Sequence, residues 1–322
     1  MRALVTGGAG FIGSHLVDAL VDEGADVVVL DDLSTGRADN VSPAADLVDG
    51  SVVDQNALDE AIHRCDVVFH QAAIPSVPRS VQRPIETDRA NTGGTLGVLV
   101  AAHRADVRRV VIASSSSVYG GEHEGPTHET VMLTPHSPYA VSKLNGEHYA
   151  RVFAELYDLD TVALRYFNVF GPRQAADSAY AAVIPRFADA LLKGDAPVVF
   201  GDGLQSRDFT FVSDAVQANL RAARASAAVC AGRAFNVARG ETHTLLELIE
   251  ILQQCLGVDI APQHLDARPG DVRHSHADIS AAREKLGYRP RVSFADGLAQ
   301  TLTWFRASAN AGAAPVRGDG SP

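Results

Sequence analysis

Thr6-Gly7-Gly8-Ala9-Gly10-Phe11-Ile12-Gly13 is the stretch of sequence that decides the fold. It joins a short apolar strand, Arg2–Thr6, to an amphipathic helix that we predict over Gly13–Glu23. The first, third and fourth glycines give the spacing GxxGxxG, in which the outer glycines permit a tight turn and close packing of helix on strand. The central glycine lets backbone N–H groups approach a pyrophosphate at the helix N-terminus. The segment therefore predicts a dinucleotide-binding turn.

Continuous apolar runs recur between helical stretches through the first half of the chain. Runs without polar alternation indicate strands that are buried on both faces. This rhythm predicts the α/β class, with a Rossmann-like, doubly wound parallel sheet. After the first, the predicted strands are Val27–Leu30, Val67–His70, Val110–Ala113 and Val162–Arg165, the last of which follows a helix that contains Lys143–Tyr157.

The rhythm changes after Gly171-Pro172, where loops rich in Gly and Pro surround a short strand, Pro197–Phe200, and a helix, Leu245–Leu256. We expect a sheet domain over 1–170 with a returning segment near 209–240. A smaller, interleaved substrate domain is expected over 171–208 and 241–306. Residues 307–322 offer little apolar surface to bury, so they are predicted to form a disordered tail.

Bulk composition excludes several classes of function. The formal net charge is −11, which argues against a general nucleic-acid or anionic-membrane surface. Three widely spaced cysteines, Cys65, Cys230 and Cys255, fit neither a disulfide framework nor a zinc site and favour a reducing cytoplasm. We see neither a signal-peptide pattern nor an apolar run of about 18 residues. His274 and His276 have no third partner in the sequence, so we expect no metal.

The second predicted strand ends in Leu30-Asp31-Asp32. An acid at this point accepts hydrogen bonds from the adenosine ribose hydroxyls and repels a 2′-phosphate. The glycine turn and Asp31 together therefore predict NAD as the cofactor. Arg37 lies close enough in sequence to keep NADP as an alternative.

A second set of residues carries acid–base chemistry. Tyr139 and Lys143 are four residues apart, so on a helix they lie on one face. A neighbouring cation favours the phenolate of a tyrosine, which is otherwise a poor base at neutral pH. Ser114–Ser117 follow the predicted strand Val110–Ala113 at the sheet edge where ligands bind, and a hydroxyl there can hydrogen-bond a reacting oxygen.

Three strings, TGGAGFIGSH at 6–15, SSSSVYG at 114–120 and SPYAVSK at 137–143, make the chain resemble the extended short-chain dehydrogenase/reductases. Within that group it is similar to the nucleotide-sugar epimerases and dehydratases, over about residues 1–305. The resemblance implies that Tyr139 is the acid/base, that Lys143 tunes it and holds the nicotinamide ribose, and that Ser115 is the catalytic hydroxyl.

The dehydratases carry Asp-Glu after the catalytic hydroxyl, where this chain has Ser116 and Ser117, and the decarboxylases carry a Thr-Ser-Glu type segment. The resemblance therefore favours 4-epimerisation, in which the hydride leaves C4 of the sugar and returns to its other face. LRYFNVFG at 164–171 resembles UDP-hexose 4-epimerases. Gln174 and the runs 179–185 and 76–80 resemble the UDP-N-acetylglucosamine (UDP-GlcNAc) branch. UDP-glucuronate 4-epimerases remain an alternative.

The same resemblance implies two sets of binding residues. For NAD they are Gly7, Gly10, Phe11, Ile12, Gly13, Asp31, Asp32, Ser34, Thr35, Gly36, Ser51, Val52, Gln71, Ala72, Ala73, Asn91, Ser114, Tyr139, Lys143 and Tyr166. For the UDP-sugar they are Ser76, Arg79, Ser115, Ser116, Ser117, Tyr139, Asn168, Ala182, Val183, Phe200, Arg207, Arg268, Asp271 and Ser275. Many relatives have Asp where this chain has Ser51, and Asp54 is the candidate substitute.

By resemblance, Ser275 occupies the position that limits room around the sugar C2 substituent, and a small residue there implies that an N-acetyl group fits. The resemblance also implies a homodimer with a four-helix interface. This interface would use a stripe on the helix after Asn91 and on the Lys143–Tyr157 helix, formed by Leu96, Leu99, Val152, Phe153 and Leu156. Two rivals remain: a net dehydrogenase or reductase that exchanges its cofactor with solution, and a dinucleotide sensor without catalysis. A sensor has no need of Ser115, Tyr139 and Lys143 together.

Overall fold

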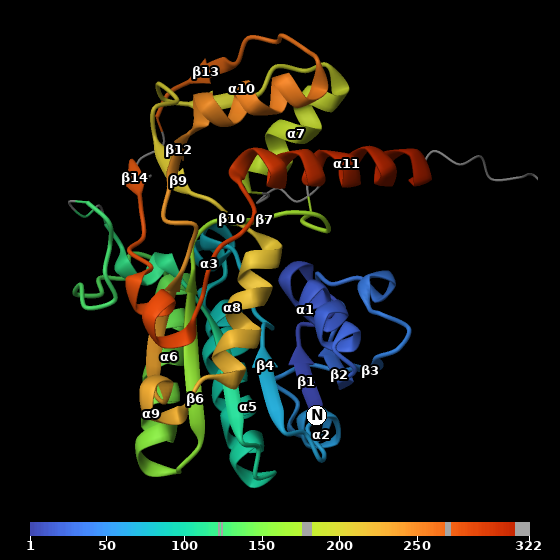
Figure 1. Ribbon diagram of the computed structural model, residues 1–322, viewed down its shortest axis with the longest axis vertical. Coiled ribbons are helices and arrows are strands. Elements are labelled where there is room, and N and C mark those ends of the chain that lie inside the picture. The colour runs from blue at the N-terminus through green and yellow to red at the C-terminus, as the bar shows by residue number, and fades with distance from the viewer. Residues whose placement is uncertain (122, 124, 176–181, 268–271, 313–322) are drawn as a thin grey trace, which may run out of the picture.

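Seven parallel strands form the central sheet of the protein (Figure 1). The computed structural model describes residues 1–121, 123, 125–175, 182–267 and 272–312. Across the sheet the strands run in the order β3 (Asp46–Asp49), β2 (Asp26–Asp31), β1 (Arg2–Thr6), β4 (Val67–His70), β5 (Arg109–Ser115), β6 (Asp160–Tyr166) and β11 (Arg233–Val237). The predicted doubly wound α/β class is confirmed, because the strand order reverses between β1 and β4.

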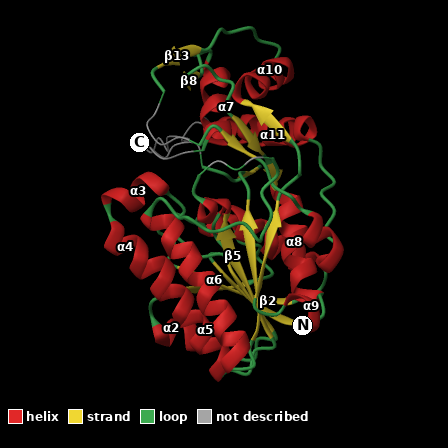
Figure 2. Cartoon of the chain, turned by 90° about the vertical axis from the view of Figure 1, so that its left-hand side faces the viewer, coloured by secondary structure: helices red, strands yellow, loops and turns green. Residues whose placement is uncertain are grey.

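Helices cover both faces of this sheet (Figure 2). One face packs on α1 (Phe11–Asp22) and α8 (Val212–Arg224), and the other packs on α2 (Gln55–Ala61), α5 (Gly94–Arg104) and α6 (Pro138–Leu156). Side chains of a strand point alternately to opposite faces. One continuous apolar run along a strand therefore supplies side chains to the helix layers on both faces of the sheet.

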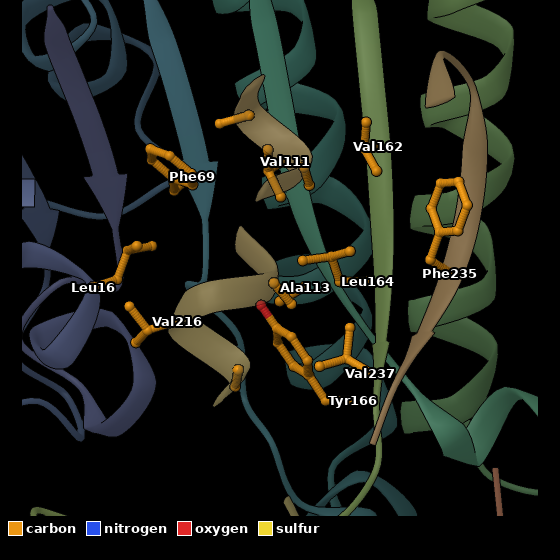
Figure 3. Close-up of a cluster of buried hydrophobic side chains, with 14 of the residues drawn as sticks. Leu16, Phe69, Val111, Ala113, Val162, Leu164, Tyr166, Val216, Phe235 and Val237 are labelled. Atoms are coloured by element: carbon orange, nitrogen blue, oxygen red, sulfur yellow. The ribbon is translucent and has the colours of Figure 1, made fainter. Parts of the chain in front are cut away.

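The first strand illustrates this alternation. Ala3 and Val5 enter the cluster below α1 and α8, whereas Leu4 enters the cluster on the opposite face. Figure 3 shows the first of these clusters, with Phe69, Val111 and Leu164 from three neighbouring strands. The two-sided burial is the physical reason why these strands read as unbroken apolar runs.

The predicted elements of the sheet domain are present, with small differences at their ends. The first helix begins at Phe11 rather than Gly13, because Gly10 is its extended N-cap. The strand predicted over Val110–Ala113 continues to Ser115. The helix predicted through Tyr157 ends at Leu156, and Tyr157 is its C-cap.

The chain after the sixth strand builds a second lobe above the carboxyl ends of the sheet (Figure 1). Its core contains Phe170, Phe209 and Phe294, and the rings of Phe209 and Phe294 stack with centroids 5.0 Å apart. Its elements are β7 (Val169–Phe170), α7 (Val183–Lys193), β8 (Val198–Phe200), β9 (Ser206–Asp208), β10 (Thr210–Phe211), β12 (Thr242–Thr244), α10 (Leu245–Leu256), β13 (Gln263–Leu265), β14 (His274–Ser275) and α11 (Phe294–Gly312).

Two regions differ from the predicted division of the chain. Ala277, Ile279 and Tyr288 pack in the cluster below α1 and α8, although this stretch was expected in the substrate domain. The Tyr288 hydroxyl donates to the carbonyl of Ala238 at 2.9 Å, which ties the stretch to the chain just after β11. Helix α11 runs to Gly312, six residues into the expected tail, because its buried Leu298 and Leu302 anchor the preceding turns in the second lobe.

Shorter elements complete the described chain. They are η1 (Ala38–Asn40), α3 (Val77–Gln82), α4 (Pro84–Asp88), η2 (Arg89–Gly93), η3 (Ser116–Tyr119), α9 (Ala227–Cys230) and η4 (Ala282–Leu286). Within the described ranges, no helix has the length and apolar character needed to cross a bilayer.

Candidate active site

A cavity of about 620 Å³ opens along the carboxyl ends of the parallel strands. This is the edge at which doubly wound sheets bind ligands, beside the point where the strand order reverses. The predicted residues that line it are Gly7, Gly10, Phe11, Ile12, Gly13, Asp31, Asp32, Ser34, Thr35, Ser51, Val52, Gln71, Ala72, Ala73, Arg79, Ser114, Tyr139, Lys143 and Tyr166. Residues far apart in sequence therefore converge on one cavity.

The glycine turn is shaped for a close approach. Gly7 has a φ of +70°, and a Cβ there would lie 2.6 Å from the backbone N of Ala72. A Cβ on Gly13 would collide with the carbonyl of Gly7. Helix α1 starts beside the cavity with no side-chain cap and no acidic residue in its first turn. Its first N–H groups and the positive end of its dipole suit a pyrophosphate, so the turn fits a dinucleotide.

Asp31 lies at the end of β2 and is only 8% exposed. Its carboxylate accepts hydrogen bonds from the backbone N–H groups of Ala9 and Leu33, both at 2.9 Å. Burial raises the pKa of Asp31, while these two bonds favour the ionised form. Gly36 does not line the cavity: it packs behind this carboxylate, where a Cβ would lie 2.9 Å from Oδ1.

The acid–base set lies where β5 meets α6. Ser137 caps α6 by accepting the N–H of Ala140 at 3.1 Å, which sets Tyr139 and Lys143 on the first two turns. The Nζ atom of Lys143 donates to the carbonyl oxygen of Ala113 at 2.8 Å and lies 6.0 Å from the Tyr139 ring centroid. Ser115, the last residue of β5, hydrogen-bonds the Tyr139 hydroxyl. Ser115 therefore contacts the phenol oxygen directly, and the ammonium of Lys143 lies near the phenol ring.

The surroundings alter the proton affinities of this set. Burial raises the pKa of Tyr139, and the hydrogen bond from Ser115 lowers it in part. Burial also lowers the pKa of Lys143 to about 8, so this amine is still mostly protonated at pH 7. A cation beside the phenol favours the phenolate, which is the form that accepts a proton.

Ser116 and Ser117 belong to η3, the short turn after β5. Both the backbone N–H and the hydroxyl of Ser117 donate to Ser115 Oγ, at 3.2 and 2.9 Å. The Ser115 hydroxyl is therefore held from both sides, by Tyr139 and by its own turn.

Asn91 lies behind the cavity rather than in its lining. Its Oδ1 atom accepts the N–H of Ile74 at 2.8 Å, and its Nδ2 atom donates to the Ser142 hydroxyl at 3.0 Å. This side chain thus fastens α6 to the loop after β4. Asn91 therefore supports the site from outside the cavity. The sequence did not predict this, because its position on a helix does not show which way the amide points.

Gln71 and Tyr166 line the cavity and share a partner that sequence reasoning missed. The Tyr166 hydroxyl donates to Gln71 Oε1 at 3.2 Å, and Gln71 Nε2 donates to Asn219 Oδ1 at 3.0 Å. Asn219 Nδ2 closes the ring by donating to the Tyr166 hydroxyl at 2.7 Å. No motif spacing joins these three positions, which lie just after β4, on β6 and on α8.

Most of the predicted substrate residues lie outside the lining of this cavity. Ser76 is the N-cap of α3, and Asn168 precedes β7 with a φ of +36°. Ala182 is the N-cap of α7 and Val183 is its first residue. Phe200 ends β8, and Arg207 and Ser275 are register partners on β9 and β14. Arg268 and Asp271 lie outside the described residues.

The sequence also missed one wall of the cavity. Ile74, Pro75, Ile85, Glu86 and Arg89 line it from the α3–α4 region. Glu86 forms an ion pair with Arg79 across this region. In the part of the chain that is described, no group of three His, Cys, Asp or Glu side chains is placed to hold a metal ion.

The fold, the glycine turn and the Ser115–Tyr139–Lys143 set define an extended short-chain dehydrogenase/reductase. Residues 3–238 match the model of the NAD dependent epimerase/dehydratase family. The chain belongs to this family, and NAD is its cofactor.

Three relatives illustrate the similarity. The UDP-glucose 4-epimerase of Mycolicibacterium smegmatis is 42% identical over 313 residues, which cover 95% of this chain and 99% of that protein. The UDP-GlcNAc 4-epimerase of Methanobrevibacter ruminantium, solved with UDP-N-acetylmuramic acid, is 41% identical with a TM-score of 0.91, covering 95% and 98%. The UDP-glucose 4-epimerase of Thermus thermophilus, solved with NAD, is 36% identical with a TM-score of 0.89, covering 96% and 100%.

Proposed function

We propose that this protein is a UDP-sugar 4-epimerase that keeps its NAD bound and interconverts UDP-GlcNAc and UDP-GalNAc, with UDP-glucose and UDP-galactose as further substrates. One observation carries the proposal: Tyr139 and Lys143 line the same cavity as the glycine turn, and Ser115 hydrogen-bonds Tyr139. Relatives at 42% and 41% identity with nearly full coverage are themselves 4-epimerases.

The proposed chemistry is a reversible proton transfer at the sugar C4 hydroxyl. Tyr139 accepts this proton as the phenolate, and the Ser115 hydroxyl donates a hydrogen bond to the same sugar oxygen. Lys143 stabilises the phenolate through its charge. NAD, when bound, supplies the hydride acceptor and donor for C4. Tyr139 then returns the proton to the oxygen of the inverted centre.

The turn after Ser115 favours epimerisation over water elimination. Elimination needs an acid and a base beside the catalytic hydroxyl, whereas the next two residues are Ser116 and Ser117. The Ser117 hydroxyl is already engaged with Ser115 Oγ at 2.9 Å. Neither serine titrates in the range that general acid–base catalysis uses, so proton transfer at a single carbon is the chemistry that remains.

Ser275 supports the acetylated substrates. It lies on β14 directly beside Arg207 of β9, a candidate diphosphate ligand. A small side chain next to a diphosphate ligand leaves room for a bulky C2 substituent. UDP-glucuronate is the weaker candidate, because the stretch LRYFNVFG at 164–171 resembles the UDP-hexose 4-epimerases.

The test is to purify the protein without added cofactor and to incubate it separately with UDP-GlcNAc, UDP-glucose and UDP-glucuronate. We expect bound NAD after denaturation and the 4-epimer of UDP-GlcNAc as the main product. Turnover that requires added NAD would instead indicate a net dehydrogenase. Epimerisation of UDP-glucuronate alone would overturn the substrate assignment.

We also propose a homodimer through α5 and α6. Its surface is smaller than the predicted stripe, because two residues of that stripe are buried within the protomer. Leu99 and Phe153 are buried in the cluster under these helices, so they pack within the protomer. Leu156 is 73% exposed, and Val141 on the same helix is also exposed. Light scattering at micromolar concentration should give twice the mass of 34.0 kDa, and a monomer would refute the dimer.

A further inference from the structure

A buried ion pair lies on the catalytic helix, one turn beyond Lys143. Glu147 of α6 and Arg165 of β6 have side chains only 7% and 5% exposed. The guanidinium binds the carboxylate in a fork, with Nε 2.9 Å from Oε1 and the second bond 2.7 Å to Oε2. Neither residue lines the main cavity, and the proposed chemistry does not use either one.

Glu147 is also bonded to the strand that carries the catalytic serine. Its Oε1 atom accepts the Ser114 hydroxyl at 2.5 Å. Tyr139, Lys143 and Glu147 are spaced four residues apart on α6, so they lie on successive turns of one face. They contact Ser115, the carbonyl of Ala113, and Ser114, respectively. Three consecutive turns of the helix thus each contact one of the last three residues of β5, although not in chain order.

Arg165 extends this connection to the turn that follows β5. Its NH1 group donates to the Tyr119 hydroxyl at 2.8 Å, and its guanidinium carbon lies 4.9 Å from the Tyr119 ring centroid. The Tyr119 hydroxyl in turn donates to Asn236 Oδ1 at 2.7 Å. Tyr119 is the last residue of η3, so the turn with Ser116 and Ser117 is fixed at its far end.

Stability alone does not explain this pair, because apolar residues of similar volume often stabilise a core equally well. The structure supplies a matched comparison on the same two strands. Arg109, which is buried, and Asp160, which is partly buried, form a second pair that joins β5 to β6 at their amino ends. Its Arg109 Nε donates to Asp160 at 2.8 Å, and Arg109 also binds the carbonyl of Ala222. This second pair contacts neither the catalytic helix nor the turn.

We infer that Glu147 and Arg165 are positioning residues, which set the register of α6 against the end of β5 and thereby hold Tyr139 in hydrogen-bonding contact with Ser115. This inference rests on the proposed function only for its rate measurement. The hydrogen bond itself is measured through the ionisation of Tyr139, which needs no substrate.

The first experiment compares E147Q with D160N and E155Q. Each of the first two removes the carboxylate charge from a buried arginine, whereas Glu155 is an exposed control on the same helix. We expect E147Q to lower kcat by roughly 10- to 100-fold with NAD still bound, since small misplacements of catalytic groups have effects of this size. The KM should change less than about threefold. D160N should be destabilised to a similar extent but keep a kcat within about threefold of wild type.

The second experiment removes the unpaired charge. In E147M/R165M no buried ion is left alone, so thermal stability should recover relative to E147Q. Its kcat should stay low, and the ionisation of Tyr139, followed by ultraviolet difference spectra against the Y139F background, should move to higher pH as the Ser115 bond is lost.

Two results would overturn the inference. One is an E147M/R165M protein with wild-type kcat and an unmoved Tyr139 titration, which would make the pair purely structural. The other is a kcat loss in D160N equal to that in E147Q. Inactive wild-type protein would contradict the proposed function instead, and the Tyr139 titration would still decide the positioning role.

Discussion

The backbone N–H of Ala9 donates a hydrogen bond of 2.9 Å to the carboxylate of Asp31. The glycine turn and the end of β2 are therefore joined through the same group that is predicted to meet the adenosine ribose. The choice of cofactor and the shape of the glycine turn therefore both depend on the Asp31 side chain. A substitution at Asp31 should alter the turn as well as remove one contact to the cofactor.

Asp31→Ala should weaken NAD binding and narrow the discrimination against NADP, because the repelling charge and the tie to Ala9 are lost together. The measurement is the NAD content after purification, followed by titration of the stripped protein with each dinucleotide. Asp59→Ala is the control, since this exposed carboxylate of α2 lies outside the cavity lining and accepts a hydrogen bond from the Gln55 amide at 3.1 Å. Wild-type protein that carries NADP would contradict the reading of Asp31.

Tyr139→Phe should abolish turnover while NAD remains bound, because only the proton-transfer group is removed. General acid–base groups contribute about 10²- to 10⁴-fold, so the variant should retain less than about a tenth of the wild-type rate. Product formation from UDP-GlcNAc and the amount of NAD released on denaturation are measured on the same sample. A Tyr139→Phe variant that keeps more than about a tenth of the wild-type rate would be incompatible with the assigned role.

Ser275→Tyr should suppress UDP-GlcNAc and UDP-GalNAc selectively, because steric overlap in a packed pocket is not relieved without cost. UDP-glucose and UDP-galactose should lose much less. The ratio of kcat/KM for the two pairs is the measurement. His274→Tyr is the matched control, since neighbouring residues of a strand face opposite sides. An unchanged ratio in the Ser275 variant would show that this residue is not the gate.

The buried His70 should make the free energy of unfolding depend on pH. Burial lowers its pKa to about 3, and its ring nitrogens pair with the hydroxyls of Thr6 at 2.8 Å and Thr95 at 3.0 Å. An unfolded histidine titrates near 6.5. Because the folded pKa is the lower one, this contribution to stability is fully present above pH 6.5 and is lost as the pH falls towards 3.

His70→Asn should therefore be less stable than wild type at pH 7 but should lose less stability between pH 7 and pH 4. Urea unfolding at several pH values measures both effects. His63→Asn is the matched control, because it makes the same replacement at an exposed site. Parallel curves for wild type and the His70 variant would contradict the role of burial.

The amino-acid sequence was sufficient for the five interior strands of the sheet and for the residues on its glycine turn, whereas the two edge strands, β3 and β11, were not predicted. Continuous apolar runs have one stable solution, burial on both faces, and the glycines at 7 and 13 tolerate no side chain where they lie. The tyrosine and lysine share a helix, so their spacing already fixed their common face. These features depend on local chain geometry, which is what a sequence pattern encodes.

Other parts of the site depend on contacts between distant elements. Asn219 reaches Gln71 and Tyr166 from α8, and Arg165 meets Glu147 from a neighbouring strand. The spacing of Glu147 from Lys143 was the one available signal, because it repeats the interval between Tyr139 and Lys143. Residues 277–288 were assigned to the second lobe for a similar reason, since their apolar positions do not reveal which core they enter.

The order of the strands has a consequence for synthesis and truncation. β11 pairs with β6 along Arg233–Val237, yet the chain builds α7, β8 and β9 of the second lobe before it returns. On the ribosome, the sheet therefore waits for more than sixty further residues after Tyr166 before its last strand emerges. A fragment that ends near Gly171 would leave β6, with the buried Val162 and Leu164, as an open edge available to other chains. The sheet is thus complete only when the chain has been translated through β11. We expect a fragment that ends near Gly171 to aggregate when it is expressed alone.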